Sequence, residues 1–327
     1  MPSSKHLVHP ELVPGLEAFP AYPAFTVDAA TLPLLRSAPP RPQREVATPG
    51  IGVEGRVAPG SAGGPDVRVL VYRPKAASEP RPAILHVHGG GYVLGSAQMS
   101  DVANRVLARD LDCVIVSVDY RLAPETRFPG NLEDCYAGLK WLHANAPALG
   151  VDASRVAIKG ESAGGGLAAG LALLARDRGE VAVAYQMLIY PMIDDREHPE
   201  PHGYVGEFIW NRESNRFGWA SILGREPGGE GVSPYAAAAR AENLAGLPAT
   251  FIAVGALDLF LEENLEYARR LMRAGVPVEL HVYPGAFHGF GLVGETALSR
   301  RADRDELEAL RQAFAATSCK GSEAAAG

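Results

Sequence analysis

The sequence has 327 residues, of which 47% are hydrophobic and 21% charged, and its formal net charge is −7. This balance is ordinary for a soluble globular protein, and an acidic chain offers no basic surface for nucleic acid or an anionic membrane. No apolar run approaches the roughly 20 residues that span a bilayer, and the first fifteen residues lack the continuous apolar core of a secretory signal. The sequence therefore predicts a cytoplasmic globular protein that binds neither membranes nor nucleic acid.

Three cysteines are present, which is an odd number, and they lack the spacing of metal ligands: Cys113, Cys135 and Cys319. Cys113 opens a strand-like apolar run, and Cys135 lies on an apolar stripe at helical spacing. We therefore expect buried thiols rather than disulfides, as in a reducing compartment.

Short apolar runs that resemble strands begin near residue 51, after a proline-rich segment that we interpret as an N-terminal arm with short helices. In chain order the predicted strands are GVEGRV, DVRVLVY, PAILHVH, CVIVSVDY, RVAIKG, AYQMLIY, TFIAVG and VELHVY. The later runs are continuous stretches of β-branched and aliphatic residues, which is typical of parallel strands covered on both faces.

Helical spacing of apolar residues separates several of these strands. The stripes predict helices around residues 132–142, 167–174, 261–272 and 307–314. Strands that alternate with helices indicate an α/β fold with a mainly parallel central sheet and helices on both faces.

One long stretch, residues 193–232, interrupts this alternation with aromatic residues, prolines and mixed charges. A connection of this length is seldom idle, so we expect it to fold partly as helix and to cap the site together with the arm. The predicted organisation is an arm (1–50) contributing to the cap, a catalytic domain in two parts (51–192 and 233–318), the cap insertion and a flexible tail (319–327).

The sequence GESAG at residues 160–164 is a G-x-S-x-G motif that follows a predicted strand and opens a predicted helix. In this context the motif is typical of a nucleophile elbow, in which a sharp turn lifts the serine hydroxyl above the sheet. The glycines two positions away on each side relieve the crowding of that turn. We predict that Ser162 is a nucleophile. The alternative is a glycine-rich turn whose serine merely caps a helix.

A serine hydroxyl needs a neighbouring base, and in proteins with this elbow the order along the chain is serine, acid, histidine. His288 lies among small residues just after the last predicted strand, and Asp258 follows an earlier strand, where active-site groups gather in open α/β sheets. We predict His288 as the base and Asp258 as the acid that orients it. A surface histidine and a helix-capping aspartate are the alternatives. The rival acids are Asp194, Asp195 and Glu262.

The sequence HGGG follows an early predicted strand. Consecutive glycines let the backbone approach a ligand closely, so Gly89, Gly90 and Gly91 are predicted to form an oxyanion hole. The amide of Ala163, next to the nucleophile, completes it. We interpret His88 as a structural anchor of this loop.

With these motifs the sequence closely resembles the hormone-sensitive-lipase-like (bacterial family IV) esterases of the α/β-hydrolase superfamily. The matching stretches are collinear over residues 80–315: HGGGYVLG, SVDYRLAPE, FPGNLEDCYAGLKWL, GESAGGGLAAGLALL, GALDLFLEEN and HVYPGAFHGF. The resemblance implies the α/β-hydrolase fold, a triad of Ser162, Asp258 and His288, no metal or organic cofactor, and short- to medium-chain acyl esters as substrates.

The residue before the nucleophile departs from the commonest family motif, because Glu161 stands where aspartate is usual. The sequence assigns no role to this glutamate. Tyr92, Phe208 and Trp210 are candidates for lining the substrate pocket. For the two aromatic residues of the insertion, packing of the cap onto the body is an equal alternative.

The sequence thus predicts a carboxylic ester hydrolase that works through an acyl-enzyme. An amidase or deacetylase with the same triad remains open, because the chemistry is shared. A non-catalytic small-molecule receptor on this scaffold is a third hypothesis. Receptors that resemble the family have lost the histidine, whereas this chain retains His288. Relatives dimerise through an edge strand, so both a monomer and a homodimer remain open.

Overall fold

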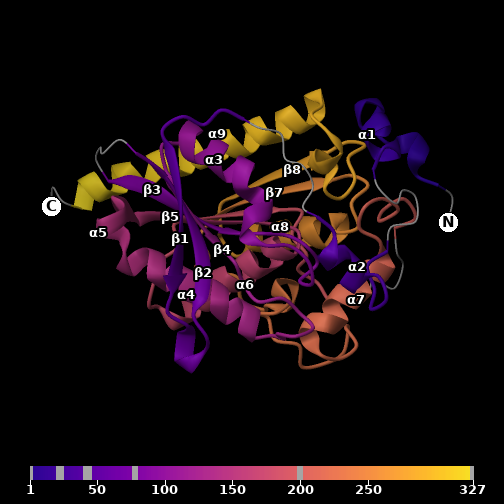
Figure 1. The fold of residues 1–327 in the computed structure, drawn as a ribbon, viewed down its shortest axis with the longest axis horizontal. Coiled ribbons are helices and arrows are strands. Elements are labelled where there is room, and N and C mark those ends of the chain that lie inside the picture. Colours follow the sequence, from indigo (N-terminus) through magenta and orange to yellow (C-terminus); the bar gives the residue numbers. More distant parts are fainter. Residues whose placement is uncertain (1–2, 20–25, 40–45, 76–79, 197–201, 325–327) are drawn as a thin grey trace.

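The computed structural model describes residues 3–19, 26–39, 46–75, 80–196 and 202–324, and it is built around one sheet (Figure 1). Its strands are β1 (Ile51–Ala58), β2 (Val67–Pro74), β3 (Arg81–Val87), β4 (Val114–Val118), β5 (Val151–Glu161), β6 (Tyr185–Ile189), β7 (Ala249–Gly255) and β8 (Val278–Tyr283). They lie in the order β1-β2-β4-β3-β5-β6-β7-β8. The pairs β1–β2 and β2–β4 are antiparallel, and all the others are parallel. The predicted strands and the mainly parallel α/β fold are confirmed.

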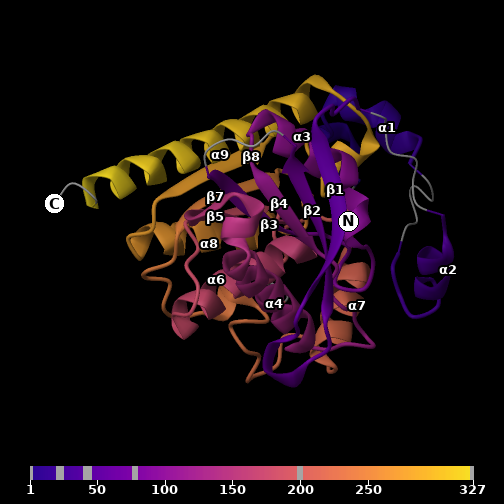
Figure 2. The same ribbon diagram turned by 60° about the vertical axis from the view of Figure 1, so that its left-hand side comes forward.

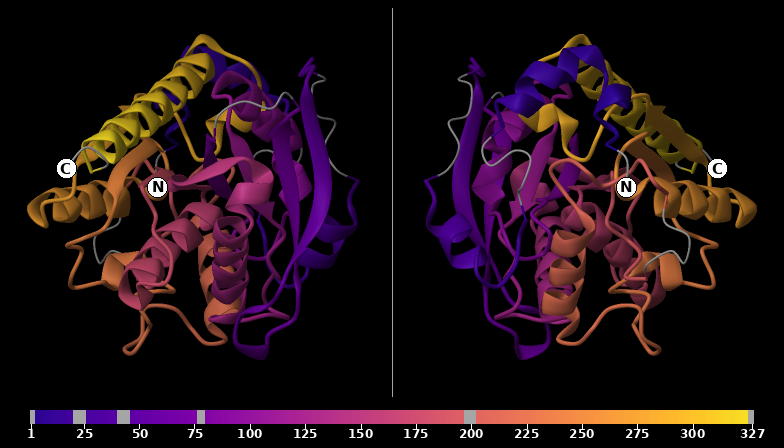
Figure 3. Two further views of the ribbon diagram at one scale, coloured as in Figure 1. Left: turned by 90° about the vertical axis from the view of Figure 1, so that its left-hand side faces the viewer. Right: turned by 90° about the vertical axis from the view of Figure 1, so that its right-hand side faces the viewer.

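The helices surround this sheet. They are α1 (Val13–Glu17), α2 (Leu32–Ser37), α3 (Asp101–Asp110), α4 (Gly130–Ala144), α5 (Ala146–Leu149), α6 (Ala163–Arg178), α7 (Arg212–Leu223), α8 (Leu261–Arg273) and α9 (Ala297–Ala324). Figures 1 and 2 show α3 and α9 on one side of the sheet and α4, α6 and α8 on the other. In the edge-on views the strands therefore lie between two helical layers (Figure 3).

Each layer encloses its own hydrophobic core, because successive residues of a strand point to opposite faces. In β3, Leu85 and Val87 pack in the core beneath α4, α6 and α8. Ile84, which precedes Leu85, packs in the second core, with Ala108 of α3 and Leu310 of α9. Central strands covered on both faces explain why β3 to β7 are nearly uninterrupted apolar runs.

The N-terminal arm lies against both the body and the insertion. Arg36 of α2 donates hydrogen bonds to the carbonyl oxygens of Val93 and Ala123, at 2.9 and 2.7 Å. The amide of Val27 donates to the hydroxyl of Ser214 in α7, at 2.9 Å. The predicted arm and cap insertion therefore contact each other.

Parts of the predicted arm, insertion and tail, residues 1–2, 20–25, 40–45, 197–201 and 325–327, lie outside the described residues. The last helix extends further than the sequence predicted, because α9 continues to Ala324 and so enters the segment expected to be a tail. Within the described ranges, none of the helices is both long and apolar enough to cross a lipid bilayer.

The close approach of α6 to the end of β3 gives a test of this packing. A Cβ atom at Gly164 would lie 2.1 Å from the carbonyl oxygen of Val87, whereas one at Gly55 in β1 would meet nothing within 4 Å. We expect Gly164→Ala to lower the free energy of unfolding by about 1–3 kcal/mol, because backbone must move to make room. Gly55→Ala should leave it unchanged within about 0.5 kcal/mol. Urea denaturation of both variants measures this, and equal stabilities would contradict the packing.

Candidate active site

The turn between β5 and α6 holds Ser162 in a conformation that L-amino acids rarely adopt, with φ 56° and ψ −122°. Such backbone costs on the order of 1–3 kcal/mol and persists only where its surroundings hold it. The amide of Ser162 donates to Ile189 O at 2.9 Å. A Cβ at Gly160 would lie 2.2 Å from the carbonyl oxygen of Gly164, so the turn can close this tightly only with glycine at that position.

Three predicted site residues, far apart in the sequence, meet above this turn. The Oγ atom of Ser162 lies 2.9 Å from Nε2 of His288, and Nδ1 of His288 lies 2.9 Å from Oδ2 of Asp258. Because a carboxylate oxygen accepts, His288 donates its Nδ1–H to Asp258, and its bare Nε2 accepts the hydrogen bond from the serine hydroxyl. The other oxygen of Asp258 accepts the backbone N–H of Phe260 at 2.9 Å. Both oxygens of the carboxylate are therefore hydrogen-bonded.

The imidazole of His288 is enclosed by aromatic rings. Tyr190 and Phe260 meet it edge-on, with ring centroids 4.8 and 5.0 Å away, and Trp210 lies at 6.4 Å. The residues of the predicted triad are almost inaccessible: Asp258 is 0% exposed, His288 5% and Ser162 7%. Charge interactions are stronger in such a water-poor site than in bulk solvent.

The glycine loop lies directly against the elbow. A Cβ at Gly89 would lie 3.4 Å from Cβ of Ser162. Gly90 and Gly91 have φ values of 124° and 60°, which favour glycine. Ala163 is the first residue of α6, and amides in the first turn of a helix have no partner within it. Gly89 therefore lies against Ser162, and the free amides of the first turn of α6 begin at the next residue.

His88 fixes the start of this loop. Burial lowers its pKa to about 4, so the ring is neutral near pH 7. Its Nδ1–H donates to Gly89 O at 2.8 Å, and the ring stacks on Tyr120 with centroids 4.2 Å apart. The hydroxyl of Tyr120 donates in turn to His88 O at 2.9 Å. These contacts agree with the structural role that the sequence suggested for His88.

A second set of contacts, absent from the sequence-based prediction, joins α8 to the nucleophile. Glu263 accepts the N–H groups of residues 193 and 194 at 2.8 and 3.2 Å, and Asn264 donates to Pro191 O at 2.8 Å. The same loop bonds to the serine, because the amide of Met192 donates to Ser162 O at 3.0 Å. The polar residues of α8 that make these contacts follow Asp258 in the sequence EEN. Polar residues at the start of a helix are common, so the sequence alone did not indicate this role.

The loop also binds the glycine segment, through Tyr92. The hydroxyl of Tyr92 donates to Met192 O at 2.8 Å, and its ring packs against Trp219 at 5.2 Å. Residues 191–194 therefore connect Ser162, α8 and the segment that contains Tyr92.

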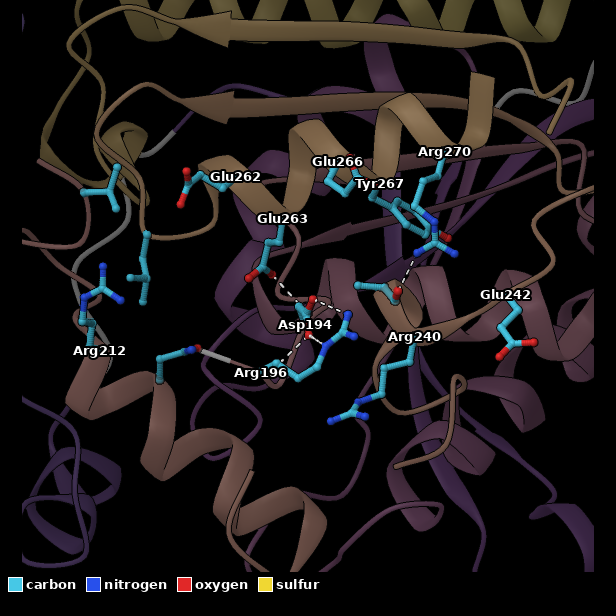
Figure 4. A pocket seen from close by; sticks show the side chains of 14 residues that line it. Asp194, Arg196, Arg212, Arg240, Glu242, Glu262, Glu263, Glu266, Tyr267 and Arg270 are labelled. Atoms are coloured by element: carbon cyan, nitrogen blue, oxygen red, sulfur yellow. Dashed lines mark hydrogen bonds and ion pairs between the residues drawn. The ribbon is translucent and has the colours of Figure 1, made fainter. Parts of the chain in front are cut away.

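The rival acids lie elsewhere. Asp194 pairs with Arg196, at 2.8 Å, and Asp195 pairs with Arg240. Glu262 is exposed and lines a separate cavity of about 920 Å³ (Figure 4). Many charged side chains line that cavity, and the three residues of the predicted triad do not. Leu259, which follows Asp258 in the sequence, borders it.

Of the three predicted pocket residues, Trp210 lies beside His288 and against the glycine loop. A Cβ at Gly91 would lie 2.1 Å from Cη2 of Trp210, so the indole lies directly on the oxyanion loop. Phe208 is 2% exposed and packs edge-on against Phe287. Tyr92 is fully buried. For these two side chains the structure shows packing rather than an open wall.

No cluster of three or more His, Cys, Asp or Glu side chains suited to a metal ion occurs in the part of the chain that the structure describes. Cys113 and Cys135 are buried free thiols, as expected.

Comparison with known proteins gives consistent likenesses. A family model described as alpha/beta hydrolase fold matches residues 84–292. Carboxylesterase NlhH of Mycobacterium tuberculosis is 36% identical over 227 residues, which cover 69% of this chain and 71% of that protein. The solved structure named Bacterial Heroin Esterase is 40% identical, with a TM-score of 0.88 over 95% of this chain and 99% of that one. Esterase LipW of Mycobacterium marinum is 41% identical, with a TM-score of 0.72 over 81% and 82%.

The hydroxyl of Tyr92 offers a test of the contacts that hold the site. We expect Tyr92→Phe to lower the free energy of unfolding by about 1–2 kcal/mol, because Met192 O then loses a buried donor. Tyr267→Phe is the matched control, since the buried hydroxyl of Tyr267 has no partner among the described residues. That variant should be neutral or slightly stabilising. Urea denaturation distinguishes the two, and equal effects would argue against the Tyr92 contact.

Proposed function

The chain belongs to the α/β-hydrolase fold family and is a carboxylesterase-type serine hydrolase of the hormone-sensitive-lipase-like group, and from that premise we propose that it cleaves short- to medium-chain acyl esters through a triad of Ser162, His288 and Asp258. One observation carries this proposal. The chain of hydrogen bonds from Ser162 Oγ through His288 to Asp258 has both links at 2.9 Å.

In the first half of the proposed reaction, the Oγ of Ser162 attacks the ester carbonyl carbon and His288 Nε2 takes the hydroxyl proton. Asp258 keeps the ring in the tautomer that can accept that proton and stabilises the imidazolium that results. The carbonyl oxygen becomes an oxyanion, which the amides of Gly90, Gly91 and Ala163 stabilise. His288 then returns the proton to the departing alcohol as the carbon–oxygen bond breaks.

In the second half, water replaces the alcohol. His288 accepts a proton from the water as its oxygen attacks the acyl carbon, and a second oxyanion forms at the same amides. Collapse of that intermediate expels Ser162 Oγ, which recovers its proton from His288. The products are a carboxylic acid and an alcohol. No group beyond those of the chain and one water is needed.

An amidase or a deacetylase would use the same groups, so the triad alone does not select the ester. Ester cleavage is favoured because the relatives described above carry esterase names. A binding protein without catalysis is disfavoured, since His288 is present and lies within hydrogen-bonding distance of both partners.

Removal of the nucleophile tests the mechanism directly. We expect Ser162→Ala to lower the turnover of p-nitrophenyl butyrate by about 10⁶, the loss seen when a triad serine is removed in a comparable enzyme. The exposed Ser154 supplies the control, because Ser154→Ala should keep full activity.

A fluorophosphonate probe separates catalysis from mere binding. It should label the unmodified protein at Ser162 and leave Ser162→Ala unlabelled. A folded, unmodified protein that refused the probe would favour the receptor hypothesis. Residual activity of more than a few per cent in Ser162→Ala would show that another residue is the nucleophile.

The size of the acyl group is proposed to depend on Trp210. Its indole lies on Gly91 and beside His288, and its Nε1–H donates to Asn215 at 3.2 Å. A side chain held in this way limits the space above the oxyanion loop. This favours short acyl groups over long ones.

We therefore expect Trp210→Phe to shift activity toward longer p-nitrophenyl esters, measured as kcat/KM from acetate to palmitate. One additional methylene in an apolar pocket is worth about 1–3 kcal/mol, so the preference should change by about tenfold or more. Trp141→Phe is the control, because Trp141 of α4 packs on the core under the sheet. An unchanged profile in Trp210→Phe would mean that other residues set the limit.

A further inference from the structure

A buried polar chain crosses the sheet on the face covered by α9, beneath the nucleophile elbow. The strand register pairs Ser117 with His86 and His86 with Lys159, so three neighbouring strands place these side chains in one row. Glu161 lies two residues beyond Lys159 and so on the same face. The mechanism above uses none of these side chains.

The chain is continuous from β4 to α9. Nδ1 of His86 lies 2.9 Å from the hydroxyl of Ser117, and Nε2 lies 3.0 Å from one carboxylate oxygen of Glu161. The other oxygen of Glu161 bonds to the Lys159 ammonium. That ammonium also lies 3.4 Å from the carboxylate of Glu306 in α9.

The direction of the hydrogen bond to Glu161 follows from a neighbour. The amide nitrogen of Asn104 can only donate, and it lies 3.3 Å from Nδ1 of His86. Nδ1 therefore accepts, and the Nε2–H of His86 donates to Glu161. The carboxylate thus receives a donor on each oxygen, the His86 ring on one and the Lys159 ammonium on the other.

The side chains of this polar chain are largely buried, and their burial and charges shift the pKa values of the two glutamates. The side chains of His86 and Lys159 are 1% and 7% exposed, and that of Glu161 is 22% exposed. Burial alone would raise the pKa of Glu161, but Lys159 and His86 outweigh it and hold the pKa well below its ordinary value. By contrast, burial raises the pKa of Glu306 to about 7. Lys159 thus pairs most closely with Glu161, and Glu306 is its more distant partner.

Glu161 is also the residue through which this chain reaches the catalytic groups. Its peptide bond leads directly into the strained backbone of Ser162. Its carbonyl oxygen would lie 2.9 Å from a Cβ at Gly89, so it abuts the oxyanion loop. A shift of Glu161 would displace both the nucleophile and the wall of the oxyanion hole.

We propose that Glu161 is a positioning residue, whose ion pair with Lys159 and hydrogen bond from His86 anchor the elbow to the sheet and hold Ser162 in line with His288. This inference rests on the proposed function, because it concerns the nucleophile assigned there. It also gives a role to the glutamate that departs from the usual family motif.

Three variants test it with p-nitrophenyl butyrate. Glu161→Gln keeps the shape and an acceptor but removes the charge. We expect kcat to fall about 10–100-fold with KM within about twofold, because a displacement near 1 Å can cost about 10² in rate. Glu306→Gln is the control and should keep kcat within about twofold, since the Lys159–Glu161 pair is untouched.

The double variant Lys159→Met, Glu161→Met separates positioning from folding. Removing one partner of a buried pair leaves an uncompensated charge, whereas removing both for apolar residues is often neutral for stability. We expect its melting temperature to recover relative to Glu161→Gln while kcat stays low. If kcat recovered together with the melting temperature, the pair would be only structural and the proposal would be overturned.

The unmodified protein distinguishes this inference from the proposed function. If it hydrolyses the ester and its Ser162 takes the fluorophosphonate probe, but Glu161→Gln keeps full kcat, only the positioning role is overturned. If the unmodified protein does neither, the proposed function itself is overturned. The rate of probe labelling in Glu161→Gln should fall in parallel with kcat, since both report the placement of Ser162.

Discussion

The strained backbone at Ser162 is the constraint around which the rest of the site is arranged. A serine with positive φ is unfavourable by itself, so its neighbours must over-determine the turn. Gly160 allows the turn to close, and the carbonyl oxygen of Ser162 accepts two N–H groups, from Gly166 in the helix and Met192 in the next loop. The same loop is held by Glu263 on α8. The conformation that places the hydroxyl beside His288 is thus maintained by contacts from α6, from the loop that contains Met192 and, through that loop, from α8.

Buried charge in this protein is tolerated because each carboxylate has defined donors. Asp258 is fully buried, yet one oxygen accepts from His288 and the other from a backbone amide. Glu161 has the same arrangement, with Lys159 and His86 as its donors. An unpaired charge in either place would be strongly destabilising. Each carboxylate is therefore fixed against a neighbour: Asp258 is hydrogen-bonded to the histidine that it is proposed to orient, and Glu161 is proposed to orient the elbow.

The sequence predicted those features that short motifs and local periodicity encode. The strands follow from runs of apolar residues, and Ser162, Asp258 and His288 each lie at a strand end, where a parallel sheet brings groups together. The buried chain could not be predicted in this way, because His86 meets Glu161 only through the register of strands distant in sequence. The residues that line the pocket could not be predicted from the sequence either. An aromatic residue in an insertion gives the same sequence pattern whether it lines a cavity, as proposed for Trp210, or packs in the interior, as Phe208 does.

The proposed catalytic groups and the proposed selectivity residue lie in different parts of the chain. The triad is held by strands and by the starts of α6 and α8, whereas Trp210 belongs to the insertion and follows Ile209, whose φ is 63°. The N-terminal arm binds the segment just before this turn, since the hydroxyls of Ser3 and Ser4 donate to Glu207 at 2.7 and 2.6 Å. Changes in the arm or insertion can therefore reshape the wall over the oxyanion loop without moving the nucleophile. This separation gives a physical reason why substrate preference can change within a single fold while the arrangement of Ser162, His288 and Asp258 is kept.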